Sequence, residues 1–264
     1  MENEAQIRLG IFIALFLIFA GIEAVIPRRP RTQTRQRRWF TNWAIILIDS
    51  LTLKLMAIAM PLLAVGAALD AGQLGSGLFN HLDWPLWLET MVTVLLLDFS
   101  IWLQHLMTHK IPILWRLHRV HHADRDIDVT TAIRFHPVEI ALSMLLKIGL
   151  VYLLGPSAFA VILFEILLNG TAMFNHANIK LPLKLDAIIR RVLVTPDMHR
   201  VHHSNIRKEH DSNYGFALSI WDRLFGTYID QPEKGHDDMT IGLQWQDDRP
   251  SSLAWILALP FFRK

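Results

Sequence analysis

Cysteine is absent from this 264-residue sequence. Disulfide bonds, iron–sulfur clusters and thiolate metal sites are therefore excluded, and any metal ion must be bound by nitrogen or oxygen ligands. The net charge at pH 7 is only +2, and the basic residues lie in separate segments rather than on one face, which argues against a nucleic acid partner. Neither a GxGxxG fingerprint nor a P-loop occurs, so the sequence shows no nucleotide-cofactor motif of its own.

Long apolar runs, in contrast, make up much of the sequence, and 52% of the residues are hydrophobic. The first run follows an acidic stretch and lacks a small-residue cleavage site, which favours a membrane span over a signal peptide. The fourth run is split by "GPS" at 155–157, a helix breaker that predicts a tight hairpin of two short spans. Asp49 and Lys54 interrupt the second run, which leaves open whether its first part lies at the membrane interface. The runs cover residues 9–27, 43–69, 86–104 and 138–174.

These runs predict an all-α integral membrane protein with about five transmembrane helices. Segments 28–40, 105–136 and 175–264 hold 6, 5 and 12 Lys or Arg residues, whereas 70–85 and the hairpin tip hold none. By the positive-inside rule, the N-terminus lies outside and the three basic segments form a cytoplasmic, histidine-rich helical cap. The apolar stretch 253–262 is too short to span and is a candidate for an interfacial position.

Histidine-rich motifs adjoin the predicted spans on the same side. The pentapeptide "HRVHH" occurs twice, at 118–122 and 199–203, and "HLMTH" occupies 105–109. On a helix, positions i, i+3 and i+4 share a face, so each motif directs its histidines in one direction. Neutral imidazole binds iron, zinc, copper and nickel, and one ion takes only three or four protein ligands. The motifs hold eight histidines, and His176 is a ninth candidate. Eight or nine histidines are too many for one ion and predict a site for two metal ions.

Acidic residues beside the motifs are candidates for orienting the ligands, because a metal-bound histidine needs a partner for its second ring N–H. Asp98 and Trp102 continue the helical face of His105 into the membrane, and Asp98 is predicted to fill this role. Asp124 and Asp126, just after the first pentapeptide, are weaker candidates.

The remaining polar residues have less specific explanations. Arg119 and Arg200, inside the two pentapeptides, are expected to pair with acids or lipid phosphates rather than with metal. Glu165 and Asn169, one turn apart in the fifth predicted span, are expected to line a cavity or to pack within the bundle. Four histidines are given no metal role: His81 on the other side of the membrane, His210 and His236 as exposed residues, and His136 with a structural or substrate-side role.

Six segments together resemble the fatty acid hydroxylase / sterol desaturase superfamily, most closely its bacterial sterol-desaturase-like members. They are "HLMTH", "LWRLHRVHHAD", "TTAIRFHPVE", "FNHANI", "TPDMHRVHHSN" and "NYGFALSIWDRLFGTY". The resemblance covers residues 85–230, which are expected to form the catalytic domain after N-terminal transmembrane helices (1–84) and before a C-terminal tail (231–264). It implies a non-haem di-iron enzyme of the bacterial inner membrane that uses O2 to hydroxylate a lipid C–H bond.

The superfamily pattern also implies particular residues and partners. Some members carry a further histidine at the position of Lys180, and Asn178 is a candidate to replace it, directly or through a water. Two iron ions, a lipid substrate from the bilayer, and an external reductase with a small electron carrier are implied. The implied metal ligands are His105, His109, His118, His121, His122, His176, His199, His202 and His203.

Three alternatives remain open at this stage. On the same site, the reaction could be lipid desaturation or ether-lipid monooxygenation, which the motifs do not separate. A zinc-dependent membrane hydrolase would need an acidic base between the histidines, as in HExxH, and "HLMTH" has none. A non-enzymatic haem or metal carrier would use only two axial histidines for a haem, which leaves most of the nine unexplained.

Overall fold

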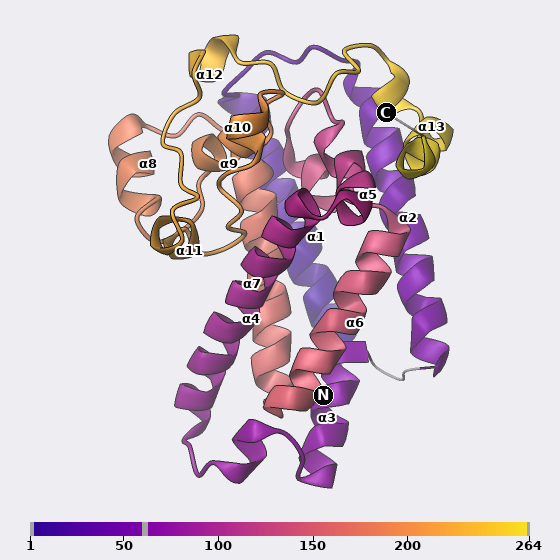
Figure 1. The fold of residues 1–264 in the computed structure, drawn as a ribbon, viewed down its shortest axis with the longest axis vertical. Coiled ribbons are helices and arrows are strands. Elements are labelled where there is room, and N and C mark those ends of the chain that lie inside the picture. Colours follow the sequence, from indigo (N-terminus) through magenta and orange to yellow (C-terminus); the bar gives the residue numbers. More distant parts are fainter. Residues whose placement is uncertain (1–2, 60–62, 263–264) are drawn as a thin grey trace.

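The computed structural model describes residues 3–59 and 63–262, which form a bundle of long helices with a cap of short helices at one end (Figure 1). Within these residues there is no β-strand, and the only extended pairings are three isolated bridges. The all-α class predicted from the sequence is therefore confirmed.

The bundle helices are long, apolar and exposed on their outward faces. By length and composition, the described residues hold five candidates to cross a membrane, one of which comprises residues 35–59 and 63–81. Leu47, Ile58 and Leu153 each expose about two thirds or more of their area (68%, 79% and 68%), as lipid-facing side chains do. The bundle helices are α1 (Glu4–Val25), α2 (Arg35–Ala59), α3 (Leu63–Leu74), α4 (Leu86–Lys110), α6 (Pro137–Leu154) and α7 (Ala158–His176).

The predicted hairpin between the last two spans is present. Helix α6 ends at Gly155, which has a φ of 64°, and Ser157 accepts a hydrogen bond from the Ala160 amide to begin α7. The loop before α4 packs on this turn so closely that a Cβ at Gly77 would lie 2.5 Å from the Gly155 nitrogen. The two segments without basic residues therefore meet at the end of the bundle opposite the cap.

The cap is built around the connections between the long helices. The linker from α1 to α2 lies across it: Asp126 accepts hydrogen bonds from the Thr32 and Gln33 amides, and the Arg28 amide donates to the Asn178 carbonyl. The cap helices are α5 (Pro112–His122), α8 (Leu183–Ile189), α9 (Pro196–His202), α10 (Arg207–His210), α11 (Ile220–Leu224), α12 (Gly235–Asp238) and α13 (Leu253–Ala258). Short 3-10 turns are η1 (Leu78–His81), η2 (Val129–Ile133), η3 (Arg249–Ser251) and η4 (Leu259–Phe261).

The C-terminal segment covers the outer side of α5. Ile256 and Leu259 are fully buried and pack with Ile45 of α2 and Val120 of α5. The Arg119 guanidinium donates hydrogen bonds to the carbonyls of Leu259 and Phe262, of which the second is 2.9 Å long. Arg119 thus binds main-chain carbonyls, in place of the acids or lipid phosphates that the sequence suggested.

A buried ion cluster joins α2 to the cap. Arg38 is 1% exposed, and its Nε and Nη1 atoms lie 2.7 and 2.5 Å from the carboxylates of Asp124 and Asp128. Thr131 donates a further hydrogen bond to Asp124. Because both carboxylates are almost fully buried, Arg38 is the cation on which their burial depends.

We predict that Arg38→Ala lowers the free energy of unfolding by about 3–5 kcal/mol, because it leaves two carboxylates buried without a counter-charge. Thermal or denaturant unfolding in detergent measures the change. Arg37→Ala is the control, since Arg37 is 53% exposed and its ion pair with Asp248 is on the surface. Equal stability of the two variants would contradict the assignment.

Candidate metal centre

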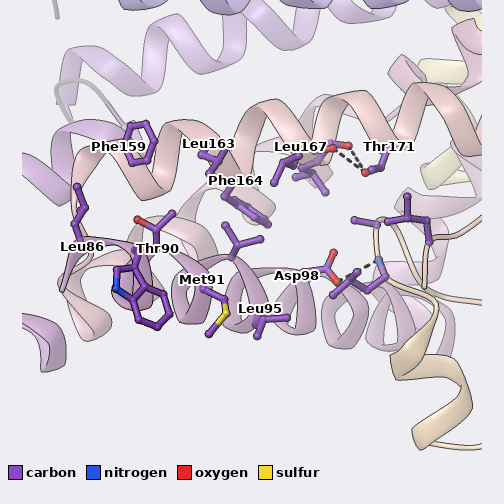
Figure 2. Close-up of a pocket in the computed structure, with 16 residues that line it drawn as sticks. Leu86, Thr90, Met91, Leu95, Asp98, Phe159, Leu163, Phe164, Leu167 and Thr171 are labelled. Atoms are coloured by element: carbon purple, nitrogen blue, oxygen red, sulfur yellow. Dashed lines mark hydrogen bonds between the residues drawn. The ribbon is translucent and has the colours of Figure 1, made fainter. Parts of the chain in front are cut away.

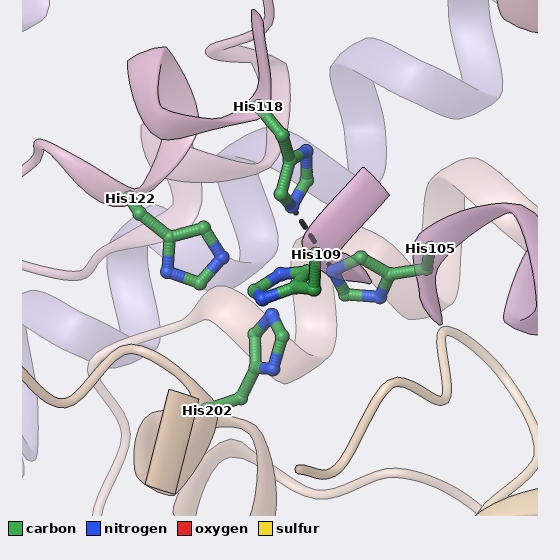
Figure 3. Close-up of side chains that lie close together, drawn as sticks. All are labelled: His105, His109, His118, His122 and His202. Atoms are coloured by element: carbon green, nitrogen blue, oxygen red, sulfur yellow. Dashed lines mark hydrogen bonds between the residues drawn. The ribbon is translucent and has the colours of Figure 1, made fainter. Parts of the chain in front are cut away.

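Nine histidines meet where the bundle joins the cap, brought there by α4, α5, α7 and α9. They form two groups, and in each group one ring nitrogen per histidine lies within 4.8 Å of the others. All nine are buried. Figure 3 shows the larger group, with its rings turned toward a common centre. The five-histidine group is His105, His109, His118, His122 and His202, and the four-histidine group is His121, His176, His199 and His203.

The two "HRVHH" motifs each contribute to both groups. In the first motif the outer i and i+4 histidines enter the five-histidine group, and the i+3 histidine enters the four-histidine group; in the second motif the assignment is reversed. The crossing residues are His121 and His202. The motifs are therefore interlocked, because neither group is complete without both.

Oxygen acceptors fix the outer nitrogen of most of these rings. His105 Nδ1 lies 2.7 Å from the Tyr214 carbonyl, and His118 Nδ1 lies 2.6 Å from Glu139 Oε1. Because a carbonyl or carboxylate oxygen accepts, Nδ1 carries the proton and Nε2 keeps its lone pair. His121, His176 and His202 make the same contact with the carbonyls of Arg134, Ala172 and Ser212, at 3.2, 2.7 and 2.6 Å.

The Nε2 lone pairs then face one another at short range. The Nε2 atoms of His105 and His118 are 3.1 Å apart, and so are those of His121 and His176. No proton lies between them when both protons are on Nδ1. Two nitrogens bound about 2.1 Å from one ion at a right angle would be about 3 Å apart. The residues present therefore fit a metal ion in each group.

The protonation of the cap histidines agrees with this fit. Burial lowers their pKa well below the ordinary value, and neighbouring imidazoles lower it further, so these rings are neutral at pH 7, the form that binds metal. Both ring nitrogens of His122 and of His203 are buried without a hydrogen-bond partner, and metal ligation would satisfy one nitrogen of each ring. The histidines concerned are His121, His122, His199, His202 and His203.

Glu139 is a functional residue that the sequence analysis missed. It lies in the first turn of α6, is 7% exposed, and holds His118 through Oε1. A carboxylate at this position orients the ring and increases its basicity as a ligand. The available signal was an acid at the start of an apolar span, directly after "RFHP".

The direct histidine contact predicted for Asp98 is wrong, because its carboxylate accepts hydrogen bonds from Trp221 Nε1 at 2.8 Å and from the Leu218 amide at 3.3 Å. Trp102 likewise contacts Asp222, at 3.0 Å, and not a histidine through its indole N–H. Both residues hold the loop 214–222, whose first carbonyl orients His105. Asp98 and Trp102 therefore position His105 only indirectly, through this loop, and not by the direct contact that the helical periodicity suggested.

The other predicted orienting residues are also engaged elsewhere. Asp124 binds Arg38, and Asp126 binds the α1–α2 linker. The Asn178 side chain exchanges two hydrogen bonds with the Arg29 main chain, at 3.1 and 2.9 Å. Lys180 is exposed, so the position of a possible tenth histidine points away from the nine. The structure corrects these expectations, because α2 binds Asp124 and the α1–α2 linker binds Asp126 and Asn178.

Four further residues differ from or refine the predictions. His210 and His236 were expected to be exposed, but both are buried; His210 stacks on Trp115 with ring centroids 5.3 Å apart. His136 has a structural role, because its Nδ1 accepts a hydrogen bond from the Val138 amide at the start of α6. Arg200 pairs with Asp197, as expected.

A cavity of about 440 Å³ extends from the five-histidine group into the bundle. His105 and His118 line one end, and side chains from α1, α2, α4, α6 and α7 form its walls. Glu165 and Asn169 line it, which confirms one of the two roles expected for them. Glu165 binds Lys147 at 2.7 Å and also Arg8.

Two other hollows differ from this cavity. The groove of about 750 Å³ between α4 and α7 is lined mostly by apolar side chains, including Met91 and Phe159, and none of its lining residues is a histidine (Figure 2). A smaller cleft of about 270 Å³ lies in the cap and reaches His109 beside Trp115 and His210. The histidines are therefore approached from the bundle through one cavity and from the cap through another.

Residues 90–227, more than half of the chain, match the family model for fatty acid hydroxylase. The chain belongs to the fatty acid hydroxylase family. It is 25% identical over 237 residues to an ornithine lipid hydroxylase of Rhizobium tropici, a match covering 88% of this chain and 70% of the relative. It is 36% identical to alkylglycerol monooxygenases of Xenopus tropicalis (155 residues; 57% of this chain, 32% of the relative) and Homo sapiens (141 residues; 52% and 30%).

This fatty acid hydroxylase family member spans about a third of the length of those two monooxygenases. No solved structure matches it. The superfamily resemblance drawn from the histidine motifs is confirmed by the family match, whose range includes all nine grouped histidines. Membership in a family of lipid oxidoreductases also displaces the zinc hydrolase and the metal carrier as explanations.

We predict that His121→Ala and His202→Ala each reduce bound iron and abolish turnover. His121→Ala removes a ligand from the four-histidine group, and His202→Ala removes one from the five-histidine group. Elemental analysis of folded, detergent-purified protein measures the iron. His81→Ala is the control, since His81 is exposed and lies at the opposite end of the bundle. Full activity in either of the first two variants would refute a shared centre.

Glu139→Gln is expected to weaken metal affinity about 10–100-fold, because an amide orients His118 but does not raise its basicity as a carboxylate does. Competition with a chelator measures the affinity. Glu89→Gln serves as the matched control, because Glu89 caps the hairpin tip through the Ser157 amide. Unchanged affinity in Glu139→Gln would remove Glu139 from the centre.

Proposed function

We propose that the protein is a membrane-bound lipid hydroxylase that holds two non-haem iron ions, one in each histidine group. The observation that carries the proposal is the pair of buried groups whose Nε2 lone pairs face one another, directly beside a cavity in the bundle. The family membership supports iron-dependent oxidation of a lipid.

The irons would supply the redox chemistry that activates O2 and attacks an unactivated C–H bond. The chain's own contribution is positioning. Glu139 and the main-chain carbonyls keep each Nδ1 protonated, so that every fixed ring presents Nε2 to the ion. His105 and His118 belong to the five-histidine group and also line the cavity, so a lipid there lies next to the ligands.

The cavity supports a substrate that enters from the bilayer. Phe12, Ile140 and Leu168 contribute apolar wall on three different helices, and such a surface binds an alkyl chain and excludes water. The large outward-facing apolar residues of the bundle support a position of the cavity at the depth of the lipid chains. A lipid is therefore favoured over a water-soluble substrate.

Electrons would come from a separate reductase with a small electron carrier. The cleft in the cap is the natural approach, because it reaches His109 from the side away from the bilayer. Arg207, 81% exposed at this cleft, would attract an acidic carrier. We place the cap in the cytoplasm of a bacterial cell and the N-terminus outside, on the charge distribution of the loops.

Ether-lipid monooxygenation is the second candidate, favoured by the 36% identity to alkylglycerol monooxygenases. Insertion of oxygen at the carbon next to an ether oxygen gives a hemiacetal, which breaks down to an aldehyde and the free alcohol. Desaturation would instead remove two hydrogen atoms and add no oxygen. Product analysis separates these three reactions.

The decisive test uses iron-loaded protein in lipid nanodiscs, isotopically labelled O2, a reductase with its carrier, and a bacterial lipid extract. We expect one lipid class to gain one labelled oxygen atom, and His202→Ala to give no product. A product carrying oxygen from water, or no oxidised lipid from fully iron-loaded protein, would contradict the proposal.

A further inference from the structure

Asp49 is a buried acid in the membrane-spanning part of α2. Its side chain is buried, with 5% of the residue exposed, and Oδ1 has neither solvent contact nor a hydrogen-bond partner among the described residues. A buried acid without a partner is costly in any protein, and more so at the depth of a bilayer.

The side chain points into the cavity that reaches the histidines. Ile46, Asp49, Ser50 and Leu53 follow helical i, i+3, i+4, i+7 spacing, and all four line this cavity. The opposite face of the same helix is exposed and apolar: Leu47, Leu51 and Leu55 are 68%, 56% and 58% exposed. The rotation of α2 is therefore fixed, with Asp49 on the cavity side.

The other charged groups around this cavity already have partners. Glu139 holds His118, and Glu165 takes both cations, Lys147 at 2.7 Å and Arg8. Asp49 has no cation within salt-bridge distance among the described residues. Among the described residues, Asp49 is therefore the acidic side chain of this cavity that has neither a cation nor a hydrogen-bond donor, whereas Glu139 receives the His118 N–H.

We propose that Asp49 recognises a nitrogen-bearing lipid by binding its ammonium group, so that the preferred substrate is an aminolipid. The assignment rests on the proposed function, because it takes the cavity as the substrate site. A lipid ammonium supplies both the positive charge and the hydrogen bonds that Asp49 lacks. A lipid without a cationic amine leaves the acid without a counter-charge and is discriminated against for that reason.

Thermal unfolding of iron-free protein in detergent tests the site without turnover, with dodecylammonium chloride and dodecanol as probes. We expect Asp49→Asn and Asp49→Leu to raise the melting temperature of the probe-free protein by about 2–4 °C, because each removes a buried unpaired acid. Dodecylammonium should raise it further in the wild type but not in these variants, and dodecanol should act equally on all. Asp70→Asn is the control, since Asp70 is an exposed acid of α3 that accepts a hydrogen bond from Tyr152 and does not line the cavity.

Two results would overturn the proposal. Lower stability or failure to fold in both Asp49 variants would show a structural role for the acid. An equal dodecylammonium shift in wild type and variants would show that Asp49 does not bind the amine.

Turnover then separates this inference from the proposed function. For an amine-bearing lipid, Asp49→Asn should lower kcat/KM at least about tenfold, mostly through KM, since a charge-assisted hydrogen bond is lost. For the N-acetylated counterpart, the variant and the wild type should differ little. If the wild type oxidises neither lipid, the proposed function is wrong, and the thermal shifts still decide whether Asp49 binds an amine.

Discussion

The structure depends on one physical constraint: neutral imidazoles whose lone pairs point at one another at about 3 Å inside a buried site. Only a cation makes that arrangement favourable, and the rest of the cap keeps it from relaxing. Glu139 and a set of main-chain carbonyls fix the outer ring nitrogens. Arg38, the α1–α2 linker and the C-terminal segment then close the cap over the helices that carry the rings.

The centre lies at a boundary between two environments. On one side, a cavity among the bundle helices reaches His105 and His118, and the proposed lipid substrate would bind there. On the other, a polar cleft in the cap reaches His109. In the proposed function, substrate and electrons would approach the same ions through these two openings, so that a hydrophobic substrate is oxidised while the electron donor stays in water.

Most polar side chains around the cavity in the bundle are paired with another polar side chain. Lys147 and Arg8 neutralise Glu165, and Gln104 accepts a hydrogen bond from Ser143. Asp49 departs from this rule, and it does so in the cavity where a substrate would bind. An unpaired acid at that position connects the stability of the protein to its choice of substrate, because removing the acid should favour the first and impair the second.

The sequence by itself determined the helical class, the five apolar stretches, the hairpin at Gly155 and all nine grouped histidines, because these follow from local periodicity and from motif spacing. Only the tertiary structure decided how each "HRVHH" motif divides between the groups, since the division depends on how α5 and α9 face each other. It also decided which oxygens orient the rings. Asp98, Trp102 and Asn178 had suitable chemistry and spacing, but Glu139 and the Tyr214 carbonyl hold these places. Hydrogen bonds between segments distant in the chain are set by packing, and no local pattern records them.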